Sequence, residues 1–329
     1  MTRAVHLVGG DCMYTQKTIK KAVACSGIGL HSGNQIQMTF KPAGVDTGIW
    51  FKRMDLANHP LIKVAYQNIV DVSYATTLGS DGATIQTVEH LLSAVNALGI
   101  TNLMIEVSGN ETPVLDGSAS CFVELLLDAG IETQRGSVRV IRIKQPLEVR
   151  GKDNIISVEP YNGLKITYTI DFPNPFIGTQ TRTFELRPLA YMKEIAHART
   201  FGLYEEIEYL WKMGLAKGGS LDNAVIFAQD RIMNASLRYT DEPVRHKILD
   251  LVGDLTFLGS PLLGQIKVYK GGHQLHTKFI NAVLSQPDHW TYLSERDMTA
   301  QTDGIENDYP DLLPVNETAT YYSLHPEGF

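Results

Sequence analysis

The sequence predicts an α+β protein of two similar domains, each with a sheet layered on helices. Stretches of alternating polar and apolar residues, which indicate strands, come before stretches of helical periodicity in each half of the chain. The halves also repeat one order of elements, because a helix, a glycine, a strand and a glycine-containing turn follow His90 and again follow His246. A length of 329 residues is enough for two domains of ~150 residues each.

The individual elements follow from these periodicities. In the first half, alternation predicts strands at Gln35–Phe40, Gly48–Phe51 and Asn102–Val107, and a helical period predicts helices at Ile85–Leu98 and Ala119–Ala129. In the second half, the predicted strands are Leu164–Ile170 and Gln265–Tyr269, and the predicted helices are Tyr191–Ala198, Glu205–Met213, Val244–Leu258 and His276–Leu284. If the repeat reflects a duplicated domain, each half supplies one histidine to a site at their interface.

The predicted boundaries divide the chain into four parts. They are an N-terminal extension at 1–15, a first domain at 16–135, a second domain at 136–290 and a tail at 291–329. From Glu295 onward the tail carries eight acidic residues against the single Arg296, a composition typical of a poorly ordered segment.

Composition excludes several classes of protein. The formal net charge is −7 without a basic run, which argues against a nucleic-acid partner. No apolar run approaches the ~18 residues of a membrane span, and the N-terminus lacks a secretory core. Cys12, Cys25 and Cys121 are odd in number and form no CxxC pair, which favours a reducing cytoplasm. We expect a cytoplasmic monomer.

One spacing points to a metal site. His246 and Asp250 are four residues apart, so on a helix they project from the same face, and His90 would complete a two-histidine, one-carboxylate set. Such a pair is often only a surface hydrogen bond. Here the surrounding residues Ile248 and Leu249 mark a largely buried helix, where a carboxylate needs a partner. The set matches an open catalytic zinc site and predicts a metal-dependent hydrolase.

Seven ordered segments give the chain a resemblance to the UDP-3-O-acyl-N-acetylglucosamine deacetylase family. They are Gly27–Gly33, Thr87–Ala94, Leu115–Ser118, Ala198–Gly202, Gly218–Ala224, Arg245–Leu255 and Gly272–His273, within a region from about Gln16 to Leu284. The resemblance implies two similar domains, each with a small insert beside the active site. It also implies removal of the 2-N-acetyl group from UDP-3-O-(3-hydroxyacyl)-N-acetylglucosamine, which releases acetate and commits the sugar to lipid A synthesis.

The resemblance assigns roles to residues of this chain. The implied zinc ligands are His90, His246 and Asp250, and ferrous iron suits the same set. Glu89 resembles the general base, and His273 the cation that stabilises the oxyanion or protonates the leaving nitrogen. Asp254 resembles the carboxylate paired with His273, and Thr200 the hydroxyl donor to the scissile carbonyl.

Substrate contacts are implied in the same way. Lys247 and Lys270 resemble diphosphate contacts, and Phe172 lies where the family stacks the uracil ring. An insert at about 199–225 resembles the acyl-chain passage, with Phe201, Ile207, Gly218 and Gly219 in it.

One position departs from the family pattern, and two other functions stay open. His276 stands where asparagine is usual, which puts a substrate contact there in doubt. A zinc hydrolase of another N-acyl sugar would lack Lys247 and the acyl passage. A binding paralogue without activity would have lost a ligand or the base, and neither is lost here.

Overall fold

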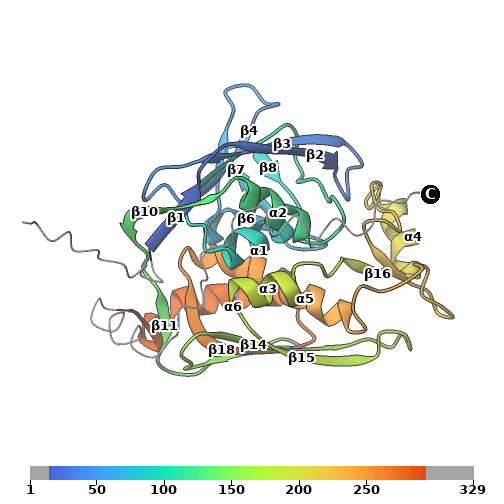
Figure 1. Cartoon of the computed structure of the whole chain (residues 1–329). Helices are drawn as coiled ribbons and strands as arrows, with labels where there is room; N and C mark the ends of the chain where they lie inside the picture. Colours follow the sequence, from blue (N-terminus) through green and yellow to red (C-terminus); the bar gives the residue numbers. More distant parts are fainter. Residues whose placement is uncertain (1–14, 294–329) are drawn as a thin grey trace, which may run out of the picture. The chain divides into compact units, whose positions relative to one another are not determined.

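The structure, a computed structural model, describes residues 15–293. This region contains two sheets that have the same strand order (Figure 1). The first sheet has the order β2 (Val23–Ile28), β3 (Gln35–Pro42), β9 (Leu103–Val107), β4 (Ile49–Arg53) and β5 (Leu61–Lys63). The second contains the order β12 (Leu147–Arg150), β13 (Ile155–Glu159), β18 (Leu262–Tyr269), β14 (Leu164–Asp171) and β15 (Thr179–Glu185). Strands β11 (Ile141–Ile143) and β19 (Trp290–Tyr292) extend that second sheet.

The pairing senses agree as well as the order. Strand β9 runs antiparallel to β3 and parallel to β4, and β18 runs antiparallel to β13 and parallel to β14. Each half also ends its sheet with an antiparallel pair, β4 with β5 and β14 with β15. The two halves therefore have the same topology, as the repeated order of elements in the sequence predicts.

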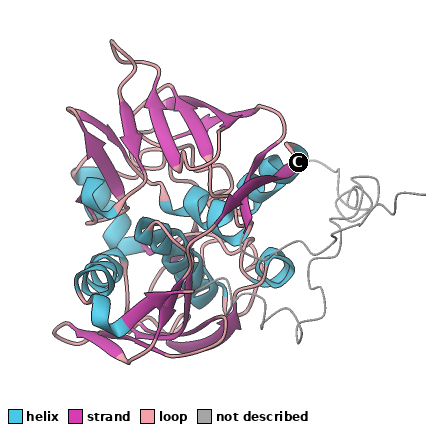
Figure 2. Cartoon of the chain, turned by 90° about the vertical axis from the view of Figure 1, so that its left-hand side faces the viewer, coloured by secondary structure: helices cyan, strands magenta, loops and turns pink. Residues whose placement is uncertain are grey.

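Helices fill the space between the two sheets in both views (Figures 1 and 2). They are α1 (Glu89–Ala97) and α2 (Ser120–Asp128) in the first half, and α3 (Pro188–Glu194), α5 (Glu242–Asp254) and α6 (His273–Ser285) in the second. Helices α1 and α5 touch through polar groups, since the Ser93 hydroxyl donates to the Leu249 carbonyl at 2.7 Å and the Asn96 amide to the Val252 carbonyl at 2.7 Å. The fold is α+β with the helices as its middle layers.

Alternation along the strands explains how each sheet faces the helices. In β3, Ile36, Met38 and Phe40 are buried, whereas Gln35 and Gln37, on either side of Ile36, are exposed. Strand β14 behaves alike: Leu164, Ile166, Tyr168 and Ile170 all point inward. Tyr168 thereby brings a hydroxyl to the helical layer, where a buried polar group needs a partner.

Gly253 sets how closely the two central helices approach. A Cβ atom at this position would lie 2.2 Å from the Glu89 carbonyl oxygen, a separation that no side chain tolerates. The last turn of α5 therefore packs directly on the first turn of α1. This contact brings Glu89 and His90 against the face of α5 that carries Asp250 and Asp254.

Each half carries an insert at the same point of its topology, after the last strand pair and before the central helix. In the first half it is the sheet of β6 (Ile69–Asp71), β7 (Thr77–Ser80) and β8 (Ala83–Ile85). In the second half it comprises β16 (Phe201–Leu203), α4 (Tyr204–Lys212) and β17 (Val225–Phe227), in which β16 and β17 pair in parallel. Separately, β1 (Thr15–Ile19) pairs with β10 (Ile131–Ser137).

Three predicted helices begin at clearly different residues in the structure, and the helix predicted at Val244–Leu258 is α5, which ends at Asp254 and continues as a 3₁₀ turn at Leu255–Leu258. The helix predicted from Ile85 begins at Glu89, because Ile85 closes β8 and Thr87 has a left-handed backbone (φ 59°) that no helix continues through. The helix predicted at Tyr191–Ala198 is α3, which starts earlier at Pro188, a residue favoured in a first helical turn. The helix predicted from His276 begins at His273, so that histidine is helical rather than part of the turn.

Most of the predicted extension and tail lie outside residues 15–293. The first two tail residues, 291 and 292, belong to β19. Within the described range, no helix combines the length and apolar character needed to cross a membrane.

Candidate active site

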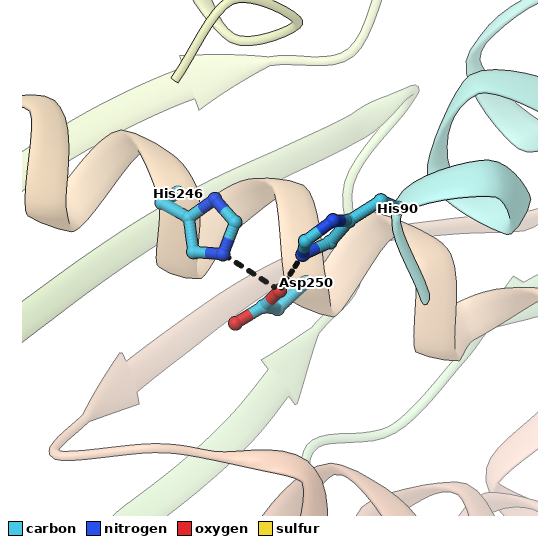
Figure 3. Close-up of side chains that lie close together, drawn as sticks. All are labelled: His90, His246 and Asp250. Carbon is cyan, nitrogen blue, oxygen red and sulfur yellow. Dashed lines mark ion pairs between the residues drawn. The ribbon is translucent and has the colours of Figure 1, made fainter. Parts of the chain in front are cut away.

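His90, His246 and Asp250 converge where α1 meets α5 (Figure 3). Asp250 Oδ1 lies 3.4 Å from His246 Nε2 and 3.9 Å from His90 Nε2, and the two rings stand edge to face with centroids 4.9 Å apart. All three side chains are buried. The i, i+4 spacing on α5 places two of them on one face, and the start of α1 supplies the third.

The protonation of this group suits metal binding. His246 Nδ1 lies 3.0 Å from the Ala198 carbonyl and donates to it, which leaves the Nε2 lone pair facing Asp250. Burial, followed by the neighbouring His246, lowers the pKa of His90 to about 3, so its ring is neutral near pH 7. Burial pushes the pKa of Asp250 upward, but the charges around it, with Lys247 as the largest of them, together hold that pKa well below its usual range.

The two carboxylate oxygens of Asp250 have different surroundings. Asp250 Oδ2 accepts a hydrogen bond from Lys247 Nζ at 2.8 Å, whereas Asp250 Oδ1 is buried and has no hydrogen-bond partner within residues 15–293. A buried carboxylate oxygen without a donor is costly unless a cation completes it. The two imidazoles that face the same oxygen are neutral and present lone pairs, so the donor set fits a divalent metal.

Glu89 is the first residue of α1, adjacent to His90 of the candidate metal site. Its Oε2 accepts the backbone N–H of Thr76 at 3.1 Å, and its Oε1 lies 3.7 Å from His273 Nε2. Burial is the main cause that raises the pKa of Glu89 to about 7, although the His273 charge opposes it. A carboxylate with a pKa near the working pH suits a general base.

His273 begins α6 and contacts Asp254 from α5. Its Nδ1 lies 2.7 Å from Asp254 Oδ2. Burial alone would lower the pKa of His273, but the charge of Asp254, followed by that of Glu89, raises it to about 10. Burial also opposes ionisation of Asp254, yet its contacts with His273 lower the pKa of Asp254 to about 2. The pair is therefore an imidazolium beside a carboxylate.

Thr76, in the insert of the first half, links the two acid–base groups. Its backbone N–H holds Glu89, and its hydroxyl donates to Asp254 Oδ1 at 2.9 Å. The side chain is fully buried. Sequence reasoning missed Thr76 because the contact joins residues 178 positions apart and leaves no local pattern.

Left-handed residues precede both helices that present an acid–base group. Thr87 (φ 59°) lies two residues before Glu89, and Lys270 (φ 55°) lies three before His273. Such backbone is strained for residues other than glycine and persists where neighbours hold it. The Thr87 hydroxyl donates to the fully buried Glu111 at 3.0 Å, and Glu111 also accepts the backbone N–H of His31 at 2.8 Å.

The loop before β16 carries Thr200. Ala198, two residues earlier, orients His246, and the Thr200 backbone is held between Gly117 and Val225 by hydrogen bonds of 2.8 Å each. Glu242, at the start of α5, anchors the same loop by accepting the Arg199 backbone N–H at 3.0 Å and its Nε at 2.9 Å. Thr200 thus follows closely after Ala198, whose carbonyl orients His246 of the candidate metal site.

The predicted nucleotide contacts lie in different settings. Lys247 is held by Asp250 and stands 5.6 Å from the centroid of the Phe201 ring. Lys270 pairs with Asp153 at 3.2 Å on the surface. Phe172 packs edge to face on Phe201 with centroids 5.6 Å apart. Lys247 is thus the one of the two lysines that contacts the ligand group.

The predicted acyl-chain residues lie around the second insert. The Phe201 ring contacts that of His246, with centroids 6.3 Å apart. Ile207 on α4 packs over Gly202, where a Cβ atom would lie 3.6 Å from Ile207 Cγ1. The Gly218 N–H donates to the Leu30 carbonyl at 3.0 Å, and that of Gly219 to the Ala216 carbonyl at 3.2 Å. Gly218 thus docks the insert on the Gly27–Gly33 segment, whereas the Gly219 hydrogen bond lies within the insert.

Comparison with known proteins gives one consistent result. A family model described as UDP-3-O-acyl N-acetylglycosamine deacetylase matches residues 16–285. The UDP-3-O-acyl-N-acetylglucosamine deacetylase of Saccharophagus degradans is 45% identical over 290 residues, which cover 87% of this chain and 95% of the relative. The enzyme of that name from Pasteurella multocida is 44% identical, with 89% and 98% covered. That from Syntrophus aciditrophicus is 42% identical, with 86% and 90% covered.

Proposed function

The chain belongs to the family of UDP-3-O-acyl N-acetylglycosamine deacetylases, and we propose that it hydrolyses the 2-acetamido group of UDP-3-O-(3-hydroxyacyl)-N-acetylglucosamine. The products are acetate and the free 2-amine, and the step commits the sugar to lipid A synthesis. The observation that carries this proposal is the buried Asp250 Oδ1, which faces two imidazole nitrogens and lacks a donor within the described residues.

A divalent cation would be held by His90, His246 and Asp250. Two imidazoles, one carboxylate and an open position are typical of catalytic zinc, and ferrous iron suits the same donors. We infer zinc as the resident metal. When bound, it supplies Lewis acidity toward the water and the amide carbonyl.

The remaining chemistry falls to side chains of the chain itself. Glu89, with its pKa raised to about 7, takes the proton of the attacking water. His273, kept cationic by Asp254, stabilises the developing oxyanion or gives its proton to the departing nitrogen. Thr200 donates its hydroxyl to the same carbonyl oxygen. The two groups lie close together, since His273 Nε2 is 3.7 Å from Glu89 Oε1.

Recognition of the substrate divides between its two ends. Lys247 and Lys270 contact the diphosphate, and Phe172 stacks on the uracil. Phe201, Ile207, Gly218 and Gly219 border the passage for the acyl chain in the second insert. The contact between Phe201 and His246 supports this arrangement, because it places an apolar wall beside a metal ligand.

We also propose that the enzyme acts in the cytoplasm as a monomer. Cys25 and Cys121 are free thiols, which suits a reducing compartment. Burial raises the pKa of both thiols, so neither is a reactive thiolate near pH 7. Light scattering of the purified chain tests the monomer.

The direct test is acetate release from UDP-3-O-(3-hydroxyacyl)-N-acetylglucosamine by purified protein. We expect release that a chelator abolishes and zinc restores, and that is much slower with the sugar lacking its 3-O-acyl chain. Equal release from both sugars would favour a hydrolase of another N-acyl sugar. No release from folded, metal-loaded protein would contradict the proposal.

A further inference from the structure

A chain of hydrogen bonds continues behind Asp254, away from His273. His276 Nδ1 lies 2.8 Å from Asp254 Oδ2, and the Tyr168 hydroxyl lies 3.0 Å from His276 Nε2. Tyr168 and His276 are fully buried, and Asp254 is 1% exposed. Asp254 Oδ2 thus receives two imidazoles, one from His273 and one from His276.

The chemistry of the three groups fixes which atom carries each hydrogen. Asp254 is a carboxylate and only accepts, so His276 Nδ1 must carry a hydrogen. Burial lowers the pKa of His276, so its ring is neutral and Nε2 bears a lone pair. Burial likewise raises the pKa of Tyr168 well above its usual range, so the intact hydroxyl donates to Nε2. Every donor in the chain therefore points toward Asp254.

Gly271 leaves room for the Tyr168 hydroxyl, which is independent evidence for the position of that group. A Cβ atom at position 271 would lie 2.5 Å from that hydroxyl oxygen and 2.4 Å from Val268 Cγ1. Any other residue there would displace the hydroxyl from His276. The turn that leads into α6 therefore accommodates the last group of the chain as well as presenting His273.

The geometry immobilises the Asp254 carboxylate. Its Oδ1 accepts the Thr76 hydroxyl at 2.9 Å, and its Oδ2 accepts His273 at 2.7 Å and His276 at 2.8 Å. Rotation about the Cβ–Cγ bond would break contacts on both oxygens. Asp254 in turn sets the ring plane of His273, whose Nε2 faces Glu89.

We propose that Tyr168 and His276 are positioning residues, which fix Asp254 and through it the imidazolium of His273. The inference rests on the proposed function, since His273 acts in that reaction. An asparagine at position 276 would keep a donor comparable to Nδ1, but its carbonyl oxygen is bonded to the same carbon and would not reach the place where Nε2 accepts from Tyr168. The imidazole of His276 therefore extends the hydrogen-bond chain from Asp254 to the Tyr168 hydroxyl.

The decisive variant is His276→Leu, which fills a similar volume and removes the donor to Asp254. We expect kcat to fall roughly 10- to 100-fold, as for other groups that orient a catalytic residue. KM and zinc per chain should stay unchanged. His276→Asn keeps the donor and should lose less. A wild-type kcat in folded His276→Leu protein would overturn the proposal, as would a second zinc ion per chain that this variant loses.

A double-mutant cycle tests the pair even if His276→Leu does not fold. Tyr168→Phe should lower kcat about 2- to 10-fold, the value of one hydrogen bond. In a His276→Asn background it should cost nothing further, because the shorter asparagine has no atom in the place of Nε2 to accept from the hydroxyl. Equal costs in both backgrounds would refute the coupling. Tyr191→Phe is the matched control, since Tyr191 is equally buried and its hydroxyl, 2.7 Å from the Ser93 hydroxyl, lies outside the chain.

Nitrogen NMR of histidine-labelled protein separates this inference from the proposed function. His276 should appear as a neutral ring protonated at Nδ1, and Tyr168→Phe should shift its Nε2 resonance. That result can be obtained even if the wild type releases no acetate, in which case the proposed function alone fails. A ring protonated at Nε2 would overturn the hydrogen-bond chain.

Discussion

The starts of α1 and α6 share one design but hold opposite charges. Each follows a left-handed residue, and each begins with an acid–base group of the site: Glu89 on α1 and His273 on α6. A helix N-terminus carries a partial positive charge, which favours a carboxylate and opposes an imidazolium. The helix end therefore assists the ionisation of Glu89, which burial opposes, whereas His273 depends on Asp254 for its charge. The two halves thus share a topology, but the acid–base group of the second half, His273, needs a carboxylate partner to hold its charge.

The largest effects should come from removing either of the two groups themselves. Glu89→Ala and His273→Ala should each lower kcat about 10²- to 10⁴-fold, the usual contribution of a general acid or base. Both variants should keep their zinc, measured by atomic absorption, because neither residue is in the ligand group. His246→Ala is the contrast, and should lose the metal together with the activity. If Glu89→Ala protein kept its turnover, Glu89 would not be the general base.

The unequal support of the two groups should appear in the pH profile. In the wild type, kcat should rise near pH 7 as Glu89 loses its proton and fall near pH 10 as His273 loses its own. Asp254→Asn removes the main charge that raises the pKa of His273, so the basic limb should move to lower pH. We also expect kcat to fall roughly 10- to 100-fold. An unmoved basic limb would show that another group titrates there.

A smaller change should follow at Thr76, which touches both helix starts by different atoms. Thr76→Val keeps the backbone N–H that holds Glu89 but removes the hydroxyl that holds Asp254. We expect kcat to fall about 2- to 10-fold, the value of one hydrogen bond, with the acidic limb of the profile in place. Thr76→Ser restores the hydroxyl and serves as the control. A shift of the acidic limb would mean that the hydroxyl also supports Glu89.

The smallest effects should distinguish the two left-handed residues by sign. Lys270→Gly relieves backbone strain and loses only a surface pair with Asp153, so Tm should rise by ~1–3 °C. Thr87→Gly relieves the same strain but removes the hydroxyl donor to the buried Glu111, which keeps only the backbone N–H groups of His31 and Ser32, so Tm should fall by ~1–3 °C. Calorimetry at one pH measures both. Changes of the same sign would show that Glu111 contributes little to the strained turn.

Local pattern predicted the long elements and failed where contacts are distant. Alternation located β3, β4, β9 and β14, because these strands have one buried face. The three-residue strands of both inserts are too short to show a period. The i, i+4 spacing indicated His246 and Asp250, and the family resemblance supplied Glu89 and His273. The roles of these residues remain predictions.

Other residues had no signal that a single sequence could show. Thr76 reaches Asp254 across 178 positions, and Tyr168 reaches His276 across 108. Tyr168 reads only as an inward residue of a strand, and His276 only as a departure from a family pattern. Their meeting depends on how β14 and α6 pack, which is decided by the tertiary fold. The periodicity of a sequence does not predict side-chain networks of this kind.

The contact at Gly253 has a mechanical consequence. Where two helices touch with no side chain between them, the contact acts as a fulcrum, and displacement under a relative rotation grows with distance from it. Glu89 supplies the touching carbonyl, and Asp254 is the neighbour of Gly253, so both sit almost on the axis. Such a rotation would widen or narrow the approach to the site while leaving its acid and base nearly still.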